Sequence, residues 1–150
     1  MSAITIENAA AQDFMPLIRE LLSTYHAFAS FDADGHRLSG SDLTVAQANV
    51  IFTLGNTDGM TCKDIGDITL ITKGTLTGVV DRLEQKDLVE RWSVEGDGRK
   101  TIVALTRRGK RAYQREFPRH IEFLKLKFDD LNARDRKQAV ELLQKIRNLF

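Results

Sequence analysis

The sequence predicts a mainly α-helical chain that carries one small β-hairpin. Apolar residues recur at helical spacing in most segments of the 150 residues, and only two prolines interrupt them. Residues 88–94 and 101–105 are instead rich in β-branched and aromatic residues, and the glycine-rich stretch 95–100 between them is typical of a turn. The length is enough for one domain with a sizeable core.

The N-terminal third predicts one long helix followed by a loop. Residues 1–10 show no clear period, whereas apolar residues recur at helical spacing from Asp13 to Ala29. Pro16 is compatible with this helix because it lies in the first turn. Residues 31–42 contain acidic residues and glycines, so we expect a loop there.

Two short capped helices are predicted next. Thr44 and Gln47 form a capping box at the start of a helix over 44–54, and Thr61 with Asp64 begins a helix that ends near Ile68. A tight turn at 69–71 leads to Thr72, the predicted cap of a helix over 72–86. Two short helices joined by a tight turn describe a helix-turn-helix, and the following hairpin would be its wing.

The predicted helix 72–86 has one apolar side and one open side. Leu76, Val79 and Leu83 fall on the apolar stripe, while Gly74 and Gly78 lie opposite. Each glycine costs roughly 1 kcal/mol against alanine in a helix, so another requirement should keep them there. That requirement is close approach to another surface, or alternatively close packing between helices.

The C-terminal part predicts two further helices. Thr106 caps a long helix over 107–131, in which Pro118 should cause a kink or a one-turn interruption, and Asn132 caps the last helix. Together with the first helix they present more apolar surface than a small winged domain can cover. We therefore expect a homodimer.

The composition excludes several classes of protein. Catalytic motifs are absent, so we predict no enzyme, no catalytic residues and no cofactor. A single cysteine, Cys62, fits a reducing compartment, and no apolar run reaches the length of a membrane span, so we expect a cytoplasmic protein without a membrane partner. Residues 70–115 carry 11 Lys and Arg against 6 Asp and Glu, as expected for a unit that meets a polyanion.

In these features the sequence resembles the MarR family of bacterial winged-helix transcriptional regulators over essentially its whole length. The matching stretches are listed in chain order: Leu43-Thr44 with Gln47, Thr61–Ile65, Thr72–Thr77, Val80–Leu83, Leu88–Arg91, Asp97–Lys100, Leu105-Thr106 and Gly109. The resemblance implies a winged helix-turn-helix lobe at 44–106 and N- and C-terminal helices, 11–31 and 107–150, that form an intertwined dimerisation region. It also implies double-stranded DNA as partner, a repressor acting on a pseudo-palindromic operator, and a small aromatic or anionic effector.

The resemblance further implies which residues meet DNA. The recognition helix would lie in a major groove and the wing in the flanking minor groove, with Lys73 and Arg82 on phosphates and Arg99 in the minor groove. Where the family often has serine and arginine, this chain has Gly74 and Gly78. The predicted DNA-binding residues are Thr72, Lys73, Gly74, Thr75, Thr77, Gly78, Arg82, Asp97, Arg99 and Lys100.

Several alternatives stay open from the sequence. Tyr25, His26, Phe28 and Phe52 either line an effector cavity or belong to the core. Cys62 in a helix first turn could act as a redox switch or have no sensing role. Only Glu116 and His120 show ligand spacing among histidines and acids, so we predict no metal site, although a redox- or metal-responsive regulator remains an alternative. A further alternative is that the chain is a winged-helix module that binds another protein instead of DNA.

Overall fold

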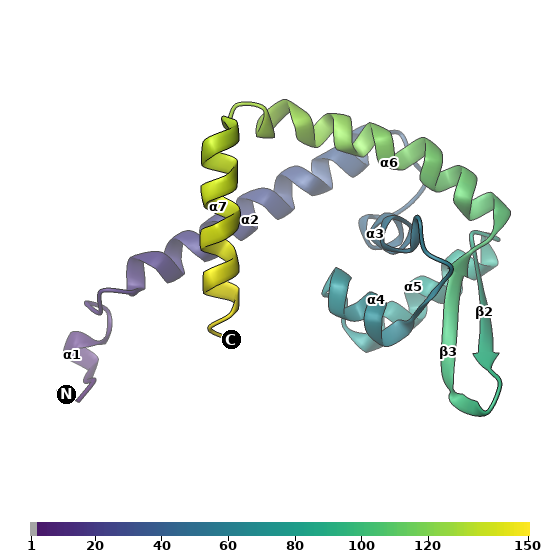
Figure 1. Cartoon of the computed structure of the whole chain (residues 1–150), viewed down its shortest axis with the longest axis horizontal. Helices are drawn as coiled ribbons and strands as arrows, with labels where there is room; N and C mark the ends of the chain where they lie inside the picture. The colour runs from purple at the N-terminus through teal and green to yellow at the C-terminus, as the bar shows by residue number, and fades with distance from the viewer. Residues whose placement is uncertain (1–2) are drawn as a thin grey trace. The chain divides into compact units, whose positions relative to one another are not determined.

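The computed structural model describes residues 3–150, apart from the side chains of residues 97–99. The chain divides into two compact units, Met1–Asp34 and Gly35–Phe150. The first unit holds α1 (Ile6–Ala9) and most of α2 (Met15–Leu38), and the second holds the remaining elements (Figure 1). The division into a lobe at 44–106 and dimerisation helices at 11–31 and 107–150 stays a prediction.

Helix α2 is longer than the sequence predicted. It continues to Leu38, so the loop expected from residue 31 onward is wrong over its first eight residues. The reason is tertiary packing at Gly35, where an added Cβ would lie 2.5 Å from Cδ1 of Phe123. A glycine that looks like a helix breaker in the sequence therefore lets this helix end pack against α6 (Arg107–Phe128).

The three helices of the predicted helix-turn-helix region are confirmed as α3 (Val45–Leu54), α4 (Cys62–Thr69) and α5 (Lys73–Gln85). The backbone N–H of Gln47 donates to Thr44 Oγ1 over 3.3 Å, and the N–H of Thr44 donates to Gln47 Oε1 over 3.2 Å, which completes the capping box. Thr61 Oγ1 accepts from the N–H of Asp64 over 3.1 Å. Local capping therefore sets where α3 and α4 begin.

A three-stranded antiparallel sheet follows the helices, in the order β1-β3-β2. The hairpin consists of β2 (Val89–Val94) and β3 (Asp97–Leu105), and the short β1 (Met60–Thr61) pairs with β3. Because β3 begins at Asp97, the turn is confined to Glu95 and Gly96, and the longer turn expected over 95–100 is wrong. Gly96 has φ +83°, a conformation that favours glycine.

A single apolar cluster holds the second unit together. Figure 1 shows α3, α4 and α5 gathered beside the hairpin, and α6 leaving the end of β3. The buried members of the cluster come from each of these elements and from the segments joining them: Leu43, Ala48, Val50, Ile51, Leu54, Ile65, Leu76, Val79, Val80, Leu83, Leu88, Val89, Val103, Leu105 and Ala112.

The last two helices are α6 and α7 (Ala133–Arg147). Thr106 Oγ1 accepts from the N–H of Gly109 over 3.0 Å, and Asn132 Oδ1 accepts from the N–H of Asp135 over 2.9 Å, as both caps predicted. Helix α6 continues through Pro118, without the one-turn interruption considered from the sequence. None of the described helices is both long and apolar enough to span a membrane.

Candidate nucleic-acid interface

Helix α5 is anchored by one side and open on the other. Leu76, Val80 and Leu83 are at most 2% exposed and belong to the apolar cluster of the second unit. Because this stripe faces inward, the residues on the other side of the helix face solvent. The exposed positions predicted from the sequence are Thr72, Lys73, Gly74, Thr75, Thr77 and Arg82, and Gly78 is half-buried.

The two glycines of α5 are not required by packing within the chain. A Cβ built on Gly74 or Gly78 would have no described heavy atom within 4 Å. At Gly109 of α6, by contrast, the same Cβ would overlap the carbonyl oxygen of Leu88. Helix packing within the chain therefore explains Gly109 but not the pair on α5.

The N-terminus of α5 is not capped by a side chain. Thr72 occupies the N-cap position, as predicted, but its hydroxyl donates to Thr75 Oγ1 over 3.1 Å and accepts no backbone N–H. The first N–H groups of a helix have no partner inside the helix, and the helix dipole adds partial positive charge there. This end of α5 is therefore suited to a phosphate oxygen.

Two carboxylates of α5 are neutralised by the wing. Arg91 of β2 contacts Asp81 Oδ1 over 2.9 Å and also pairs with Glu84. The hydrogen bond and charge of Glu84, with a smaller contribution from Asp81, raise the pKa of Arg91 above its ordinary value. Lys73 and Arg82 form no ion pair with a described residue. The open side of α5 therefore presents unpaired cations and paired anions.

The sequence did not predict the role of Arg91. From the sequence, residues 88–91 were interpreted only as the start of the wing. Closeness in the sequence could have indicated this role. Strand β2 follows α5 after a short turn, so its side chains lie near the last turns of that helix.

A groove runs between α4, the start of α5 and strand β3. It encloses about 1080 Å³, and its cationic lining residues are Lys63, Lys73 and Lys100. Asp64 lies at the same groove; a hydrogen bond from Thr61 and, less strongly, nearby lysines lower the pKa of its carboxyl group. The fold thus brings the predicted residues Lys73, Thr77 and Lys100 together around one groove.

Lys63 was not among the predicted site residues. It lies in the first turn of α4 with Nζ 3.7 Å from Asp67 Oδ2, and both side chains are well exposed. Cys62 is half-buried and lines the same groove.

The remaining predicted site residues are Asp97 and Arg99 of the wing and the four residues of the expected effector cavity. The side chains of Asp97 and Arg99 lie outside the described residues, so their predicted roles stay predictions. Tyr25, His26 and Phe28 belong to the first unit and Phe52 to the second, and the effector cavity predicted around them likewise stays a prediction.

These features define a class of protein. A helix-turn-helix whose second helix has an open, cationic outer side, followed directly by an antiparallel wing, is the architecture of winged helix-turn-helix DNA-binding regulators. Residues 41–100 match the sequence model of the MarR family. This match confirms, for residues 41–100, the resemblance to the MarR family of transcriptional regulators that the sequence indicated.

Known proteins agree with this assignment. An HTH-type transcriptional regulator of Bacillus cereus is 28% identical over 106 residues, which cover 70% of each chain. BpsR from Bordetella bronchiseptica, whose DNA binding is regulated by 6-hydroxynicotinic acid, has a solved structure that matches with a TM-score of 0.71 at 27% identity. The match covers 87% of this chain and 98% of BpsR. Sco3205 from Streptomyces coelicolor, solved in complex with DNA, shares the fold with a TM-score of 0.76 at 17% identity, covering 98% and 89% of the two chains. These relatives are transcriptional regulators and not enzymes.

Proposed function

We propose that this chain acts as a homodimeric repressor that places α5 in the major groove of a pseudo-palindromic operator. The observation that carries the proposal is the open side of α5. Gly74 and Gly78 have no described neighbour within 4 Å of an added Cβ, and they lie beside the unpaired cations Lys73 and Arg82. A helix face without side-chain bulk and with positive charge fits close contact with a phosphate-lined groove.

The wing is proposed to contact the flanking minor groove. Lys100 is exposed on β3, and the sequence places Arg99 and Asp97 next to it. An arginine that enters a narrow minor groove gains from its strong negative potential. We assign that role to Arg99, with Asp97 orienting its guanidinium.

Unburied apolar residues support the homodimer. No residue of α7 is buried within the chain, although Val140, Leu142 and Leu143 are each more than half exposed. In the first unit, α2 exposes a second apolar set, which includes Leu22 at 55% and Tyr25 at 58%. Apolar surface of this extent on a soluble regulator is expected to be covered by a second copy. Two-fold symmetry then predicts half-sites about 10 bp apart.

A small aromatic or anionic effector is proposed to alter DNA affinity. BpsR, a relative of similar fold, responds to an aromatic acid. Tyr25, His26, Phe28 and Phe52 stay the proposed contacts for its aromatic part.

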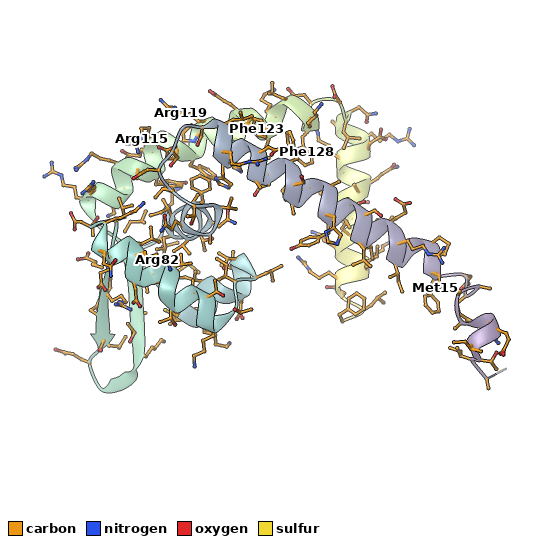
Figure 2. The ribbon with its side chains drawn as sticks, turned by 180° about the vertical axis from the view of Figure 1, so that it is seen from behind. Met15, Arg82, Arg115, Arg119, Phe123 and Phe128 are labelled. Atoms are coloured by element: carbon orange, nitrogen blue, oxygen red, sulfur yellow. The ribbon has the colours of Figure 1, made fainter. Side chains whose placement is uncertain are left out.

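The experiment is selection of genomic fragments by the purified full-length protein, followed by gel shifts and sedimentation analysis. We expect a dimer that retains specific duplex fragments. Arg99→Ala should lower affinity for them by at least about 30-fold while the dimer persists, because one minor-groove contact is lost from each protomer. Arg119→Ala, which removes an exposed arginine of α6, is the matched control and should leave affinity unchanged (Figure 2).

Two results would count against the proposal. Equal affinity of Arg99→Ala and the parent protein would remove the wing from the mechanism. A chain that stays monomeric at micromolar concentration and retains no duplex fragment would overturn the proposed function itself.

A further inference from the structure

Leu70, in the turn that joins α4 to α5, has an unusual backbone conformation (Figure 1). It is the C-cap residue of α4 and has φ +57° and ψ +18°, in the left-handed region. Glycine adopts this conformation without steric cost, and asparagine or aspartate tolerates it, whereas leucine is disfavoured there. Asp87, with φ +56°, is the other described non-glycine residue with positive φ, and it belongs to the tolerated type. The backbone of Leu70 is therefore strained.

The turn around Leu70 is fixed by its neighbours. The hydroxyl of Thr69 donates to the carbonyl oxygen of Ile65 over 2.7 Å and accepts from the N–H of Ile71 over 3.4 Å. Ile71 also packs against the apolar cluster of the second unit. The residues on both sides of Leu70 are thus held by the fold, and this arrangement keeps the leucine in its strained conformation.

The side chain of Leu70 gains little from packing within the chain. Although it is large and apolar, it is 76% exposed. A residue that is both strained and exposed lowers the stability of the fold in two ways. Strained residues persist mainly at functional sites, and exposed apolar groups there are typical of contact with a partner.

The surroundings of Leu70 indicate the chemistry of this partner. Leu70 lines the groove between α4, α5 and β3, together with Lys73, Thr77 and Lys100. It also lies only two positions before Thr72, the N-cap residue of α5. An apolar side chain among cations fits a partner that is anionic and carries an apolar group at its surface. Duplex DNA has such a group in its major groove, the C5-methyl of thymine.

We propose that Leu70 contacts the C5-methyl group of one thymine in each half-site of the operator and thereby selects thymine at that position. The inference rests on the proposed function, in which α5 lies in the major groove, and it adds a specificity-determining residue outside that helix. Gly74 and Gly78, on the open side of α5, have no side chain with which to read a base. Apolar contact from the preceding turn supplies sequence information that these two positions do not.

The test removes the methyl group and the leucine separately and together. In the operator selected by the full-length protein, each symmetry-related pair of thymines is replaced by deoxyuridine, which lacks only the C5-methyl group. Burial of one methyl group corresponds to about a fourfold change in affinity, so replacement of one such pair should weaken binding by the parent protein about 15-fold. Leu70→Ala should bind the thymine operator more weakly than the parent, and the same replacement should change its affinity less than about twofold.

Two further variants serve as controls. Ile68→Ala is the matched control, because Ile68 is 60% exposed in the same helix but lies on another side of it. This variant should retain the affinity of the parent and the loss of about 15-fold with deoxyuridine. Leu70→Gly removes the strain as well as the side chain, so it should be at least as stable to heat as the parent and still be insensitive to deoxyuridine.

The outcomes separate this inference from the proposed function. The inference is overturned, and the proposed function stands, if the parent binds its operator and no thymine replacement weakens binding. An equal response of Leu70→Ala and the parent to every replacement has the same meaning, because the leucine then does not read thymine. If the parent retains no duplex fragment at all, the proposed function is overturned and this inference with it.

Discussion

Glycines in α5 and α6 have opposite surroundings. At Gly109 of α6 an added Cβ would overlap the carbonyl oxygen of Leu88, whereas at Gly74 and Gly78 of α5 it would meet nothing within 4 Å. The first glycine is needed for the fold of the chain. The other two lower the stability of a helix and are not required by packing within the chain, which supports the proposal that they face a partner. On this proposal the contrast distinguishes a glycine that builds the lobe from two that meet DNA.

The largest expected effect is on DNA binding by Gly78→Leu. A leucine at this position should exclude α5 from the groove, and we expect at least about 100-fold weaker binding to the selected operator, or about 2.7 kcal/mol. Thermal unfolding should show no loss of stability, because the added side chain has free space within the chain. Affinity within threefold of the parent protein would mean that this face of α5 does not approach DNA.

Gly109→Ala should lower the stability of the fold and leave DNA binding intact, which is the reverse of the effect expected for Gly78→Leu. The added methyl group collides with the backbone of Leu88, and overpacking of this kind typically costs about 1–3 kcal/mol. We expect the free energy of unfolding in urea to fall by about 2 kcal/mol, while DNA affinity of the folded fraction is maintained. An unchanged unfolding midpoint would contradict the tight packing of α6 on the turn before β2.

Arg91→Gln examines the charges on the open side of α5. Removing the guanidinium leaves Asp81 and Glu84 unneutralised near phosphate, so operator affinity should fall by about 10-fold in low salt. The triple variant Arg91→Gln, Asp81→Asn, Glu84→Gln should recover to within about threefold of the parent. If the triple variant stays as weak as the single one, Arg91 contacts DNA itself and does not act by neutralising the carboxylates.

The smallest expected effect is a gain in stability. Gly74→Ala adds only a methyl group in open space, and replacing glycine by alanine inside a helix contributes about 0.5–1 kcal/mol. The free energy of unfolding measured in urea should rise by that amount. A loss of stability would show that the backbone at residue 74 needs glycine for its own conformation.

Local signals made much of this fold predictable. The caps at Thr44, Thr61, Thr106 and Asn132 were each visible in the sequence, because a cap involves residues only three positions apart. The apolar stripe of α5 was equally visible, since helical spacing is a local property. The recognition helix and its exposed residues could therefore be named before the structure.

Features that depend on distant residues were missed. The sequence around Gly35 is typical of a loop, and only packing against Phe123 explains why α2 continues to Leu38. The pairing of Arg91 with α5 and the groove that includes Lys63 both require the three-dimensional arrangement.

The most direct test of the central claim is the salt dependence of operator binding by the parent protein. Lys73, Arg82, Arg99 and Lys100 are four cations per protomer that would displace counterions from DNA, so log K should fall linearly with log salt with a slope of up to about −7 for a dimer. A slope near zero, or no retention of duplex even in dilute buffer, would contradict the placement of this open helix face against DNA.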